Sequence, residues 1–219
     1  MTRFESLQIQ HRNKGNVDVW FGQYGGNHTS HGVRTAVESA LRSSTSKNNH
    51  RSYNAGDASF PAPEAPRVVM DQLDIKTKSG DVFLIDAMVA NTLKVISEQG
   101  GIVGQVTANK RIEMESKLRI ILALKSNSTS DLELKVSAET VAQVSMESPY
   151  YGHMSLTTWA SFFRPELFFS PEYTFVQQTR TMQTLTGYFS YPDANGTKPS
   201  GLLPKVRIGG ERASFTLGR

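Results

Sequence analysis

Two histidines three residues apart, His28 and His31, come closest to a metal-binding pattern in this chain. Imidazole nitrogens are common zinc ligands, but a complete site needs at least one more ligand. No matching carboxylate or third histidine follows at a recognisable spacing, and the zinc-protease pattern His-Glu-x-x-His is absent. We therefore predict no metal site and interpret the pair as exposed polar residues or as pH-sensitive contacts.

Two further patterns could serve catalysis or cofactor binding. Gly22, Gly25 and Gly26 precede an expected helix, but the Gly-Lys-Ser/Thr of a phosphate-binding loop is missing. His153 lies beside Ser155, yet no Gly-x-Ser-x-Gly turn exposes a serine nucleophile. The chain has no cysteine, which excludes disulfides, thiolate nucleophiles and sulfur-ligated metals. We expect no catalytic residue, no cofactor and no enzymatic activity.

An aromatic stretch from Tyr150 to Phe175 is the main candidate for a binding surface. Its side chains either form a second hydrophobic layer over a sheet or remain partly exposed as an apolar patch for a partner. In the second interpretation, the surface for self-association or a partner comprises Trp159, Phe162, Phe163, Phe168 and Phe169.

The charge balance is mildly basic, with 24 Lys and Arg against 20 Asp and Glu. Such a balance permits contact with phosphates or anionic lipid without requiring it. The candidate residues for membrane or nucleic-acid contact lie near the two ends of the chain: Arg12, Lys14, Arg34, Arg42, Lys47, Arg51, Lys198, Lys205, Arg207 and Arg212. The alternative is that they belong to ordinary solvated faces.

The elements that would position these residues are clearest between residues 111 and 146. Apolar residues there alternate with charged and polar ones, from Ile112 and Met114 through Leu118 to Leu124, and again from Leu132 to Met146. Successive side chains of a strand point to opposite sides. The pattern predicts a long antiparallel hairpin with one apolar and one solvated face.

A stripe at helical spacing through Val82, Ile85, Val89, Leu93 and Ile96 predicts one core helix at about 81–97. A helix packed on the apolar face of an antiparallel sheet gives an α+β core, assigned here to residues 67–219 with a mildly basic C-terminal tail. Residues 1–66, rich in Gly, Asn and Ser, are expected to form a flexible or docking arm with one short helix. No apolar run reaches the ~18 residues of a membrane-spanning helix, so we expect neither an integral membrane protein nor a secreted one.

The segment from Leu73 to Met146 resembles the core of rhabdovirus matrix proteins, including a plant-infecting member. The resemblance rests on Ile75-Lys-Thr-Lys-Ser-Gly-Asp81, the expected helix, Gly101-Ile-Val-Gly104 and the stretch from Leu118 to Ser126. The late-domain proline motifs of the animal viruses are absent; the arm has only Phe60-Pro-Ala-Pro-Glu-Ala-Pro66.

The resemblance implies a non-enzymatic viral structural protein of the virion. Such a protein associates with itself and links the viral nucleocapsid to an anionic membrane, with RNA as a further contact. It would lie in the host cytoplasm, at the membrane periphery or in the nucleus. The alternatives are an RNA-binding viral capsid or movement protein, and a viral accessory protein that binds a host factor.

Overall fold

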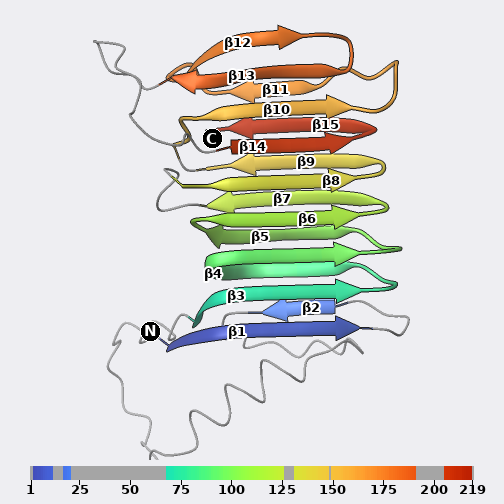
Figure 1. The fold of residues 1–219 in the computed structure, drawn as a ribbon, viewed down its shortest axis with the longest axis vertical. Helices are drawn as coiled ribbons and strands as arrows, with labels where there is room; N and C mark the ends of the chain where they lie inside the picture. Colours follow the sequence, from blue (N-terminus) through green and yellow to red (C-terminus); the bar gives the residue numbers. More distant parts are fainter. Residues whose placement is uncertain are drawn as a thin grey trace, which may run out of the picture.

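The computed structural model describes residues 2–11, 17–20, 68–125, 131–147, 149–190 and 205–218. Within these residues there are 15 strands, all in one sheet, and no helix (Figure 1). The strands are β1 (Thr2–His11), β2 (Val17–Trp20), β3 (Val68–Thr77), β4 (Val82–Ser97), β5 (Ile102–Ala108), β6 (Arg111–Ser116), β7 (Arg119–Lys125), β8 (Glu133–Ala138), β9 (Val141–Met146), β10 (His153–Thr158), β11 (Glu166–Phe169), β12 (Thr174–Arg180), β13 (Thr184–Ser190), β14 (Lys205–Gly210) and β15 (Arg212–Leu217). The prediction of an α+β core is therefore wrong.

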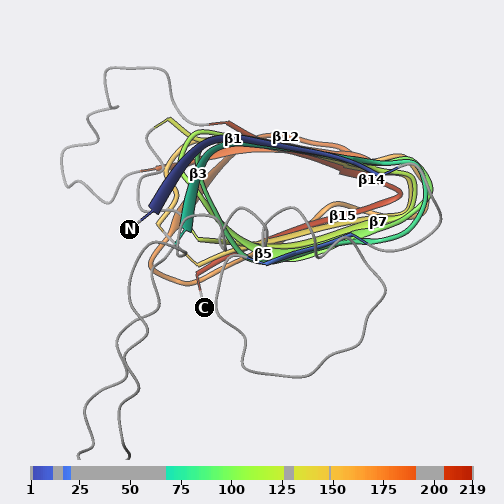
Figure 2. The ribbon, with the colours of Figure 1, turned by 90° about the horizontal axis from the view of Figure 1, so that it is seen from below.

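The strands of the central stack pair in parallel with the strand two places later in the chain. β4 pairs with β6 and β6 with β8, while β5 pairs with β7 and β7 with β9. Consecutive strands thus lie in different layers, and the chain winds as a flattened solenoid (Figure 2). We call the layer of β6, β8 and β14 layer A, and the layer of β5, β7, β9 and β15 layer B.

The segment 81–97, predicted as a helix, is the long strand β4. It pairs with β5 of layer B up to Val89 and with β6 of layer A from Thr92, so it joins the two layers. A register shift between Leu84 and Ala87, beside Asp86 with a φ of 50°, interrupts its alternation. The buried apolar positions fall at 82, 84, 87, 89, 93 and 95. Of the predicted stripe, Val82, Val89 and Leu93 are therefore buried, whereas Ile85 and Ile96 point to the other face of the strand and are half-buried.

The segment 111–146 is four strands, not one antiparallel hairpin. Its inward residues, from Ile112 to Met146, are buried as the alternation predicted, although Leu118 lies in a turn and is 47% exposed. Alternating burial is the same for a parallel coil and for an antiparallel hairpin. The short connections at 117–118 and 139–140 carry the chain from layer A to layer B, so the strands they join do not pair with each other.

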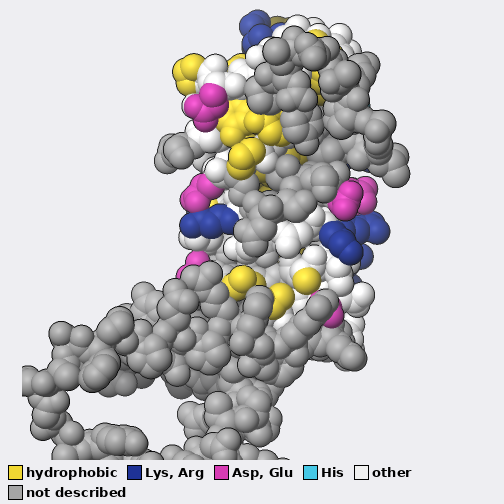
Figure 3. Space-filling model, turned by 90° about the vertical axis from the view of Figure 1, so that its left-hand side faces the viewer, with side chains coloured by type: hydrophobic (Ala, Val, Ile, Leu, Met, Phe, Trp, Pro, Cys, Tyr) yellow, Lys and Arg dark blue, Asp and Glu magenta, His cyan; other side chains and the backbone are white. Residues whose placement is uncertain are grey.

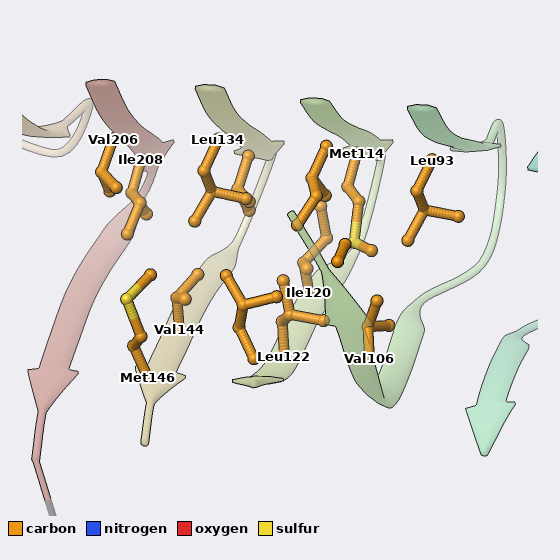
Figure 4. Packing of buried hydrophobic residues seen from close by; sticks show 14 of the residues in the cluster. Leu93, Val106, Met114, Ile120, Leu122, Leu134, Val144, Met146, Val206 and Ile208 are labelled. Carbon is orange, nitrogen blue, oxygen red and sulfur yellow. The ribbon is translucent and has the colours of Figure 1, made fainter. Parts of the chain in front are cut away.

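The core lies between the two layers and is built from columns of apolar residues that stack across neighbouring strands (Figure 4). In layer A, Leu93, Ile112, Leu134 and Val206 occupy matching positions on β4, β6, β8 and β14. In layer B, Leu122, Val144 and Phe215 do the same on β7, β9 and β15. Each coil therefore buries its inward side chains both against its neighbours in the stack and against the facing layer.

A column of small residues marks the point where layer A strands end. Thr77, Ser97, Ser116 and Ala138 are aligned by the register of β3, β4, β6 and β8, and all four are buried. The Ser97 hydroxyl donates to the Gly80 carbonyl at 3.2 Å, and the Ser116 hydroxyl donates to the Gly100 carbonyl at 2.6 Å. These hydroxyls satisfy turn backbone groups that the strand ladders leave unpaired.

The last two strands, β14 and β15, do not follow the chain order of the stack. They are joined by a tight turn but lie in different layers and form no ladder with each other; we call this two-strand segment the C-terminal hairpin in that restricted sense. β14 lies between β8 and β10, and β15 lies between β9 and β11, with all four pairings parallel. Beyond β10, β13 and β12 extend layer A as antiparallel strands. The last coil in sequence is thus an internal coil in space (Figure 1).

At the opposite end, β1 pairs in parallel with β3, and β2 pairs in parallel with β4. These two strands come from the region expected to be an arm, and they extend the same sheet. The expected short helix of that region and its proline-rich connector at 55–66 lie outside the described residues.

Candidate interaction surface

Large apolar side chains that remain exposed gather at the C-terminal end of the stack. Among the described residues there are eight, and six of them lie between positions 159 and 182. The six are Trp159, Phe162, Phe168, Phe169, Val176 and Met182. Figure 3 views the left-hand side of Figure 1, the side opposite the loops that follow β10 and β12; it shows hydrophobic side chains near this end and again below the middle of the stack, where charged side chains lie at both flanks. Exposed apolar side chains are therefore concentrated at this end, which makes it the candidate for contact with a partner.

The aromatic stretch is divided between core and surface. Phe189 is buried at the centre of a group of rings, 5.1 Å from Phe175 and 5.5 Å from Phe169 between ring centroids. Tyr150 and Phe215 are also buried and lie edge-on to each other at 6.3 Å. We call Tyr150, Phe169, Tyr173, Phe175, Phe189 and Phe215 the aromatic plug. Four of these side chains are buried, whereas Phe175 is half-buried and Phe169 remains 41% exposed at the edge of the group.

Two neighbouring loops carry the most exposed apolar side chains. The loop 159–165 follows β10 and the loop 181–183 joins β12 to β13. The Thr158 amide donates to the Gln183 carbonyl at 2.7 Å, and the Gln183 side-chain amide donates to the Trp159 carbonyl at 3.2 Å. We call the exposed side chains of these loops, Trp159, Phe162 and Met182, the apolar tip.

The first loop is held by contacts within it and with β10 and β15. The Thr158 hydroxyl donates to the Phe163 carbonyl at 2.9 Å, and the Phe162 and Phe163 rings lie 4.5 Å apart. The Arg212 guanidinium lies over the Phe163 ring at 4.0 Å, a cation–π contact. With Phe163 half-buried, the neighbouring Phe162 side chain is left 74% exposed.

Cationic side chains flank the apolar tip. Arg164 lies in the first loop, Arg180 ends β12 beside the second, and Arg212 begins β15; all three are exposed. Neither loop contains an Asp or Glu. Glu166 directly follows the first loop and Glu211 directly precedes Arg212, so the corner combines exposed apolar groups with three arginines and two glutamates.

Lys205 and Arg207 lie away from Arg212, because β14 belongs to layer A and β15 to layer B. In the register of β14 with β8, Lys205 is beside Glu133 and Arg207 is beside Lys135. Of the four basic residues predicted in this tail, the three that the structure describes, Lys205, Arg207 and Arg212, thus do not form one surface.

The outer face of layer A is a network of mixed charge centred on Glu113. The Glu113 carboxylate lies 3.3 Å from the Lys135 ammonium, 3.7 Å from that of Lys94 and 3.8 Å from the Arg111 guanidinium. Partial burial favours the neutral carboxyl, but the Lys135 hydrogen bond and the positive charges outweigh it and hold the pKa of Glu113 below its usual range. Lys205 and Arg207 extend this mixed face along the stack.

The predicted site residues meet three different outcomes. Arg12, Lys14, Arg34, Arg42, Lys47, Arg51 and Lys198 lie outside the described residues. The structure brings together Trp159, Phe162, Phe163 and Arg212, and it places Phe168 and Phe169 on the separate edge strand β11. Sequence reasoning missed Met182, whose place between two strands of threonines and glutamines would have indicated an exposed turn residue.

The described part of the chain buries few polar side chains. Its buried polar side chains are the hydroxyls of Thr77, Ser97, Ser116 and Thr158, and each is engaged in a hydrogen bond. Across these residues there is no cluster of three His, Cys, Asp or Glu that could hold a metal ion. The same residues include no helix long and apolar enough to cross a membrane.

Comparison of the chain with protein-family models, curated proteins and solved structures finds no match.

Proposed function

We propose that this chain is a non-enzymatic structural protein that attaches to an anionic membrane surface through the apolar tip. One observation carries the proposal. Two hydrogen-bonded loops present Phe162, Met182 and Trp159 with exposed fractions of 74%, 61% and 49%, beside the exposed Arg164 and Arg180.

The chemistry of the apolar tip suits the boundary between headgroups and acyl chains. Tryptophan and phenylalanine on an interfacial element insert their rings below the headgroups, while arginines pair with lipid phosphates. Each basic residue near an anionic surface adds about 1 kcal/mol of attraction. A protein partner would also bury apolar groups, but the two loops themselves hold Arg164 and no acidic residue, which favours an anionic surface.

The rhabdovirus resemblance would add a nucleocapsid as second partner and self-association beneath an envelope. The helix used in that resemblance is strand β4 in the structure. The membrane proposal therefore draws its support from the apolar tip and not from the resemblance.

RNA binding is the second candidate, because Lys135 and Arg207 are neighbours on the outer face of layer A with Lys205 close by. Nucleic acid would bind there through phosphate contacts and would be released by salt. Glu113 and Glu133 on the same face oppose such binding.

The test is co-sedimentation of the full chain with vesicles of phosphatidylcholine alone and with one-fifth phosphatidylserine. We expect binding to the anionic vesicles that weakens with salt. Phe162→Ser should reduce the partition coefficient roughly tenfold, because burial of an aromatic side chain contributes ~1.5–3 kcal/mol. Leu118→Ser, at a turn of the middle coils where the side chain is 47% exposed, is the matched control and should bind like the unmodified protein.

Tryptophan fluorescence provides a second readout. Insertion of Trp159 should shift its emission to shorter wavelength on vesicles, and Trp159→Phe should remove that shift. Binding by Phe162→Ser equal to that of the unmodified chain would refute the proposal. The proposal would also be refuted if the full chain bound neither type of vesicle but shifted single-stranded RNA in a gel in a salt-sensitive manner. That result would favour RNA binding.

A further inference from the structure

The hairpin β14–β15 occupies a slot that is one coil wide. On one side of the slot lie the edges of β8 and β9, and on the other side lie those of β10 and β11. Pairing with β8 aligns five residue pairs and pairing with β9 aligns six. The hairpin is therefore recognised by parallel ladders on both sides and in both layers.

Inward side chains of the hairpin complete the core between these coils. Val206, Ile208, Ala213, Phe215 and Leu217 are all buried. Phe215 lies 6.5 Å from Phe189 and 6.3 Å from Tyr150, at the base of the aromatic plug. The turn is equally closely fitted, since a Cβ on Gly210 would come within 3.2 Å of the Ala138 carbonyl oxygen and the Ala142 amide nitrogen.

Both walls of the slot precede the hairpin in the sequence. Strands β10 to β13 precede the hairpin in sequence but lie beyond it in the stack. An empty slot would leave two facing rows of backbone donors and acceptors together with a large apolar gap. Those groups must be matched by a hairpin of this register and this inward pattern.

We infer that the slot is also a binding site for the β14–β15 hairpin of a second copy of this chain. The contacts that seat the hairpin are backbone ladders and inward side chains, and none of them depends on which chain supplies it. Exchange of such an element links identical chains, reciprocally into a dimer or head to tail into an open series. This inference is independent of membrane attachment, because the hairpin contributes none of the three side chains of the apolar tip.

The test uses the absence of native cysteine. Gln143 on β9 and Ser214 on β15 are register partners, and both side chains reach the outer face of layer B. Neighbouring strands lie about 4.8 Å apart, within the range that a disulfide spans. In the full-length double variant Gln143→Cys with Ser214→Cys, oxidation should join the two positions within one chain.

The exchange is measured with the two single variants, each with a different mass label. Unfolded together, refolded at increasing concentration and oxidised, they should give a mixed dimer joined between positions 143 and 214, and its yield should rise with concentration. Variants folded separately and then mixed should give several-fold less. Gln143→Cys with Glu115→Cys is the control, because Glu115 lies on β6 and pairs with β4 and β8.

Two results would overturn the inference. One is a mixed dimer no more abundant than that of the control pair at every concentration, while the double variant closes its internal disulfide. The other is failure of the double variant to close that disulfide, which would show that the hairpin does not occupy the slot.

Discussion

The two layers of the solenoid share one interior but differ on their outer faces. Across layer A, outward positions in register hold Asp74, Lys94, Glu113 and Lys135. Across layer B, the corresponding row is Phe83, Val103, Ile121 and Gln143. Each coil supplies a residue to both rows, so the same winding carries a charged row on one side and a neutral, partly apolar row on the other. Stacking fixes the inward positions and leaves the outward ones free to diverge.

The largest effect should come from a charge placed inward, and it should be equal in the two layers. Leu134→Asp in layer A and Val144→Asp in layer B each bury an unpaired carboxylate between the layers. That costs several kcal/mol against a total stability of about 5–15 kcal/mol, so both variants should lose their cooperative thermal transition. A variant of one layer that melts like the unmodified protein would show that the layers do not share one core. Lys135→Ala, on the outer face, should change stability by less than ~0.5 kcal/mol.

A smaller loss of stability is expected when alanine replaces glycine, and it should be larger at the bulged part of layer B than on the regular strands of layer A. A Cβ on Gly104 would approach the Leu84 Cβ and carbonyl oxygen to 2.5 Å, whereas a Cβ on Gly209 would meet the Trp159 ring at 3.5 Å, an ordinary contact. Gly104→Ala should therefore destabilise the protein by ~1–3 kcal/mol. Gly209→Ala is the matched control and should cost less. Chemical denaturation measures both, and equal midpoints would contradict the close approach at the bulge.

The smallest change in stability should come from removing the ion pairs on the charged outer face of layer A, and it should depend on pH. The pKa of Glu113 is lower in the folded protein than its ordinary value of 4.5, so its ion pairs stabilise the fold above that pH. Their contribution is lost as the pH falls through the folded pKa. Glu113→Gln should reduce stability at pH 7 by at most ~1 kcal/mol and make little difference well below pH 4.

Lys135→Ala should overlap with that loss rather than add to it, because the two residues share one ion pair. Gln143→Ala, on the neutral face, should show no such dependence on pH. Equal losses from Glu113→Gln at pH 7 and pH 3 would show that the charged face contributes through packing alone.

The sequence predicted the interior better than it predicted the fold. Alternation from Ile112 to Met146 identified most inward residues because burial follows the two-residue period of a strand in any sheet. It could not distinguish a hairpin from a coil, since the pairing partner of β6 is β8 and not β7. The small residues at strand ends, Thr77, Ser97, Ser116 and Ala138, recur at spacings of 20, 19 and 22 residues and would have indicated a repeat.

The candidate surface was only partly predictable from sequence. The structure divides the aromatic residues predicted as partner contacts: Trp159 and Phe162 lie in the apolar tip, Phe169 belongs to the aromatic plug, and Phe168 is exposed on β11. The insertion of β14–β15 brings Arg212 to Phe163, 49 positions earlier in the chain. Local patterns carry no information about such a distant pairing.

The column of small residues at the ends of the layer A strands makes the length of the stack adjustable in whole units. The turns after Ser116 and Ala138 both have two residues, so the coil between them can be copied without altering the groups that bound it. Duplicating residues 119–140 would repeat β7, β8 and the turn after Ala138, and would lengthen the protein by about 4.8 Å along the stack. The number of coils, each marked by one residue of the column Thr77, Ser97, Ser116 and Ala138, therefore sets the length of the protein along the stack.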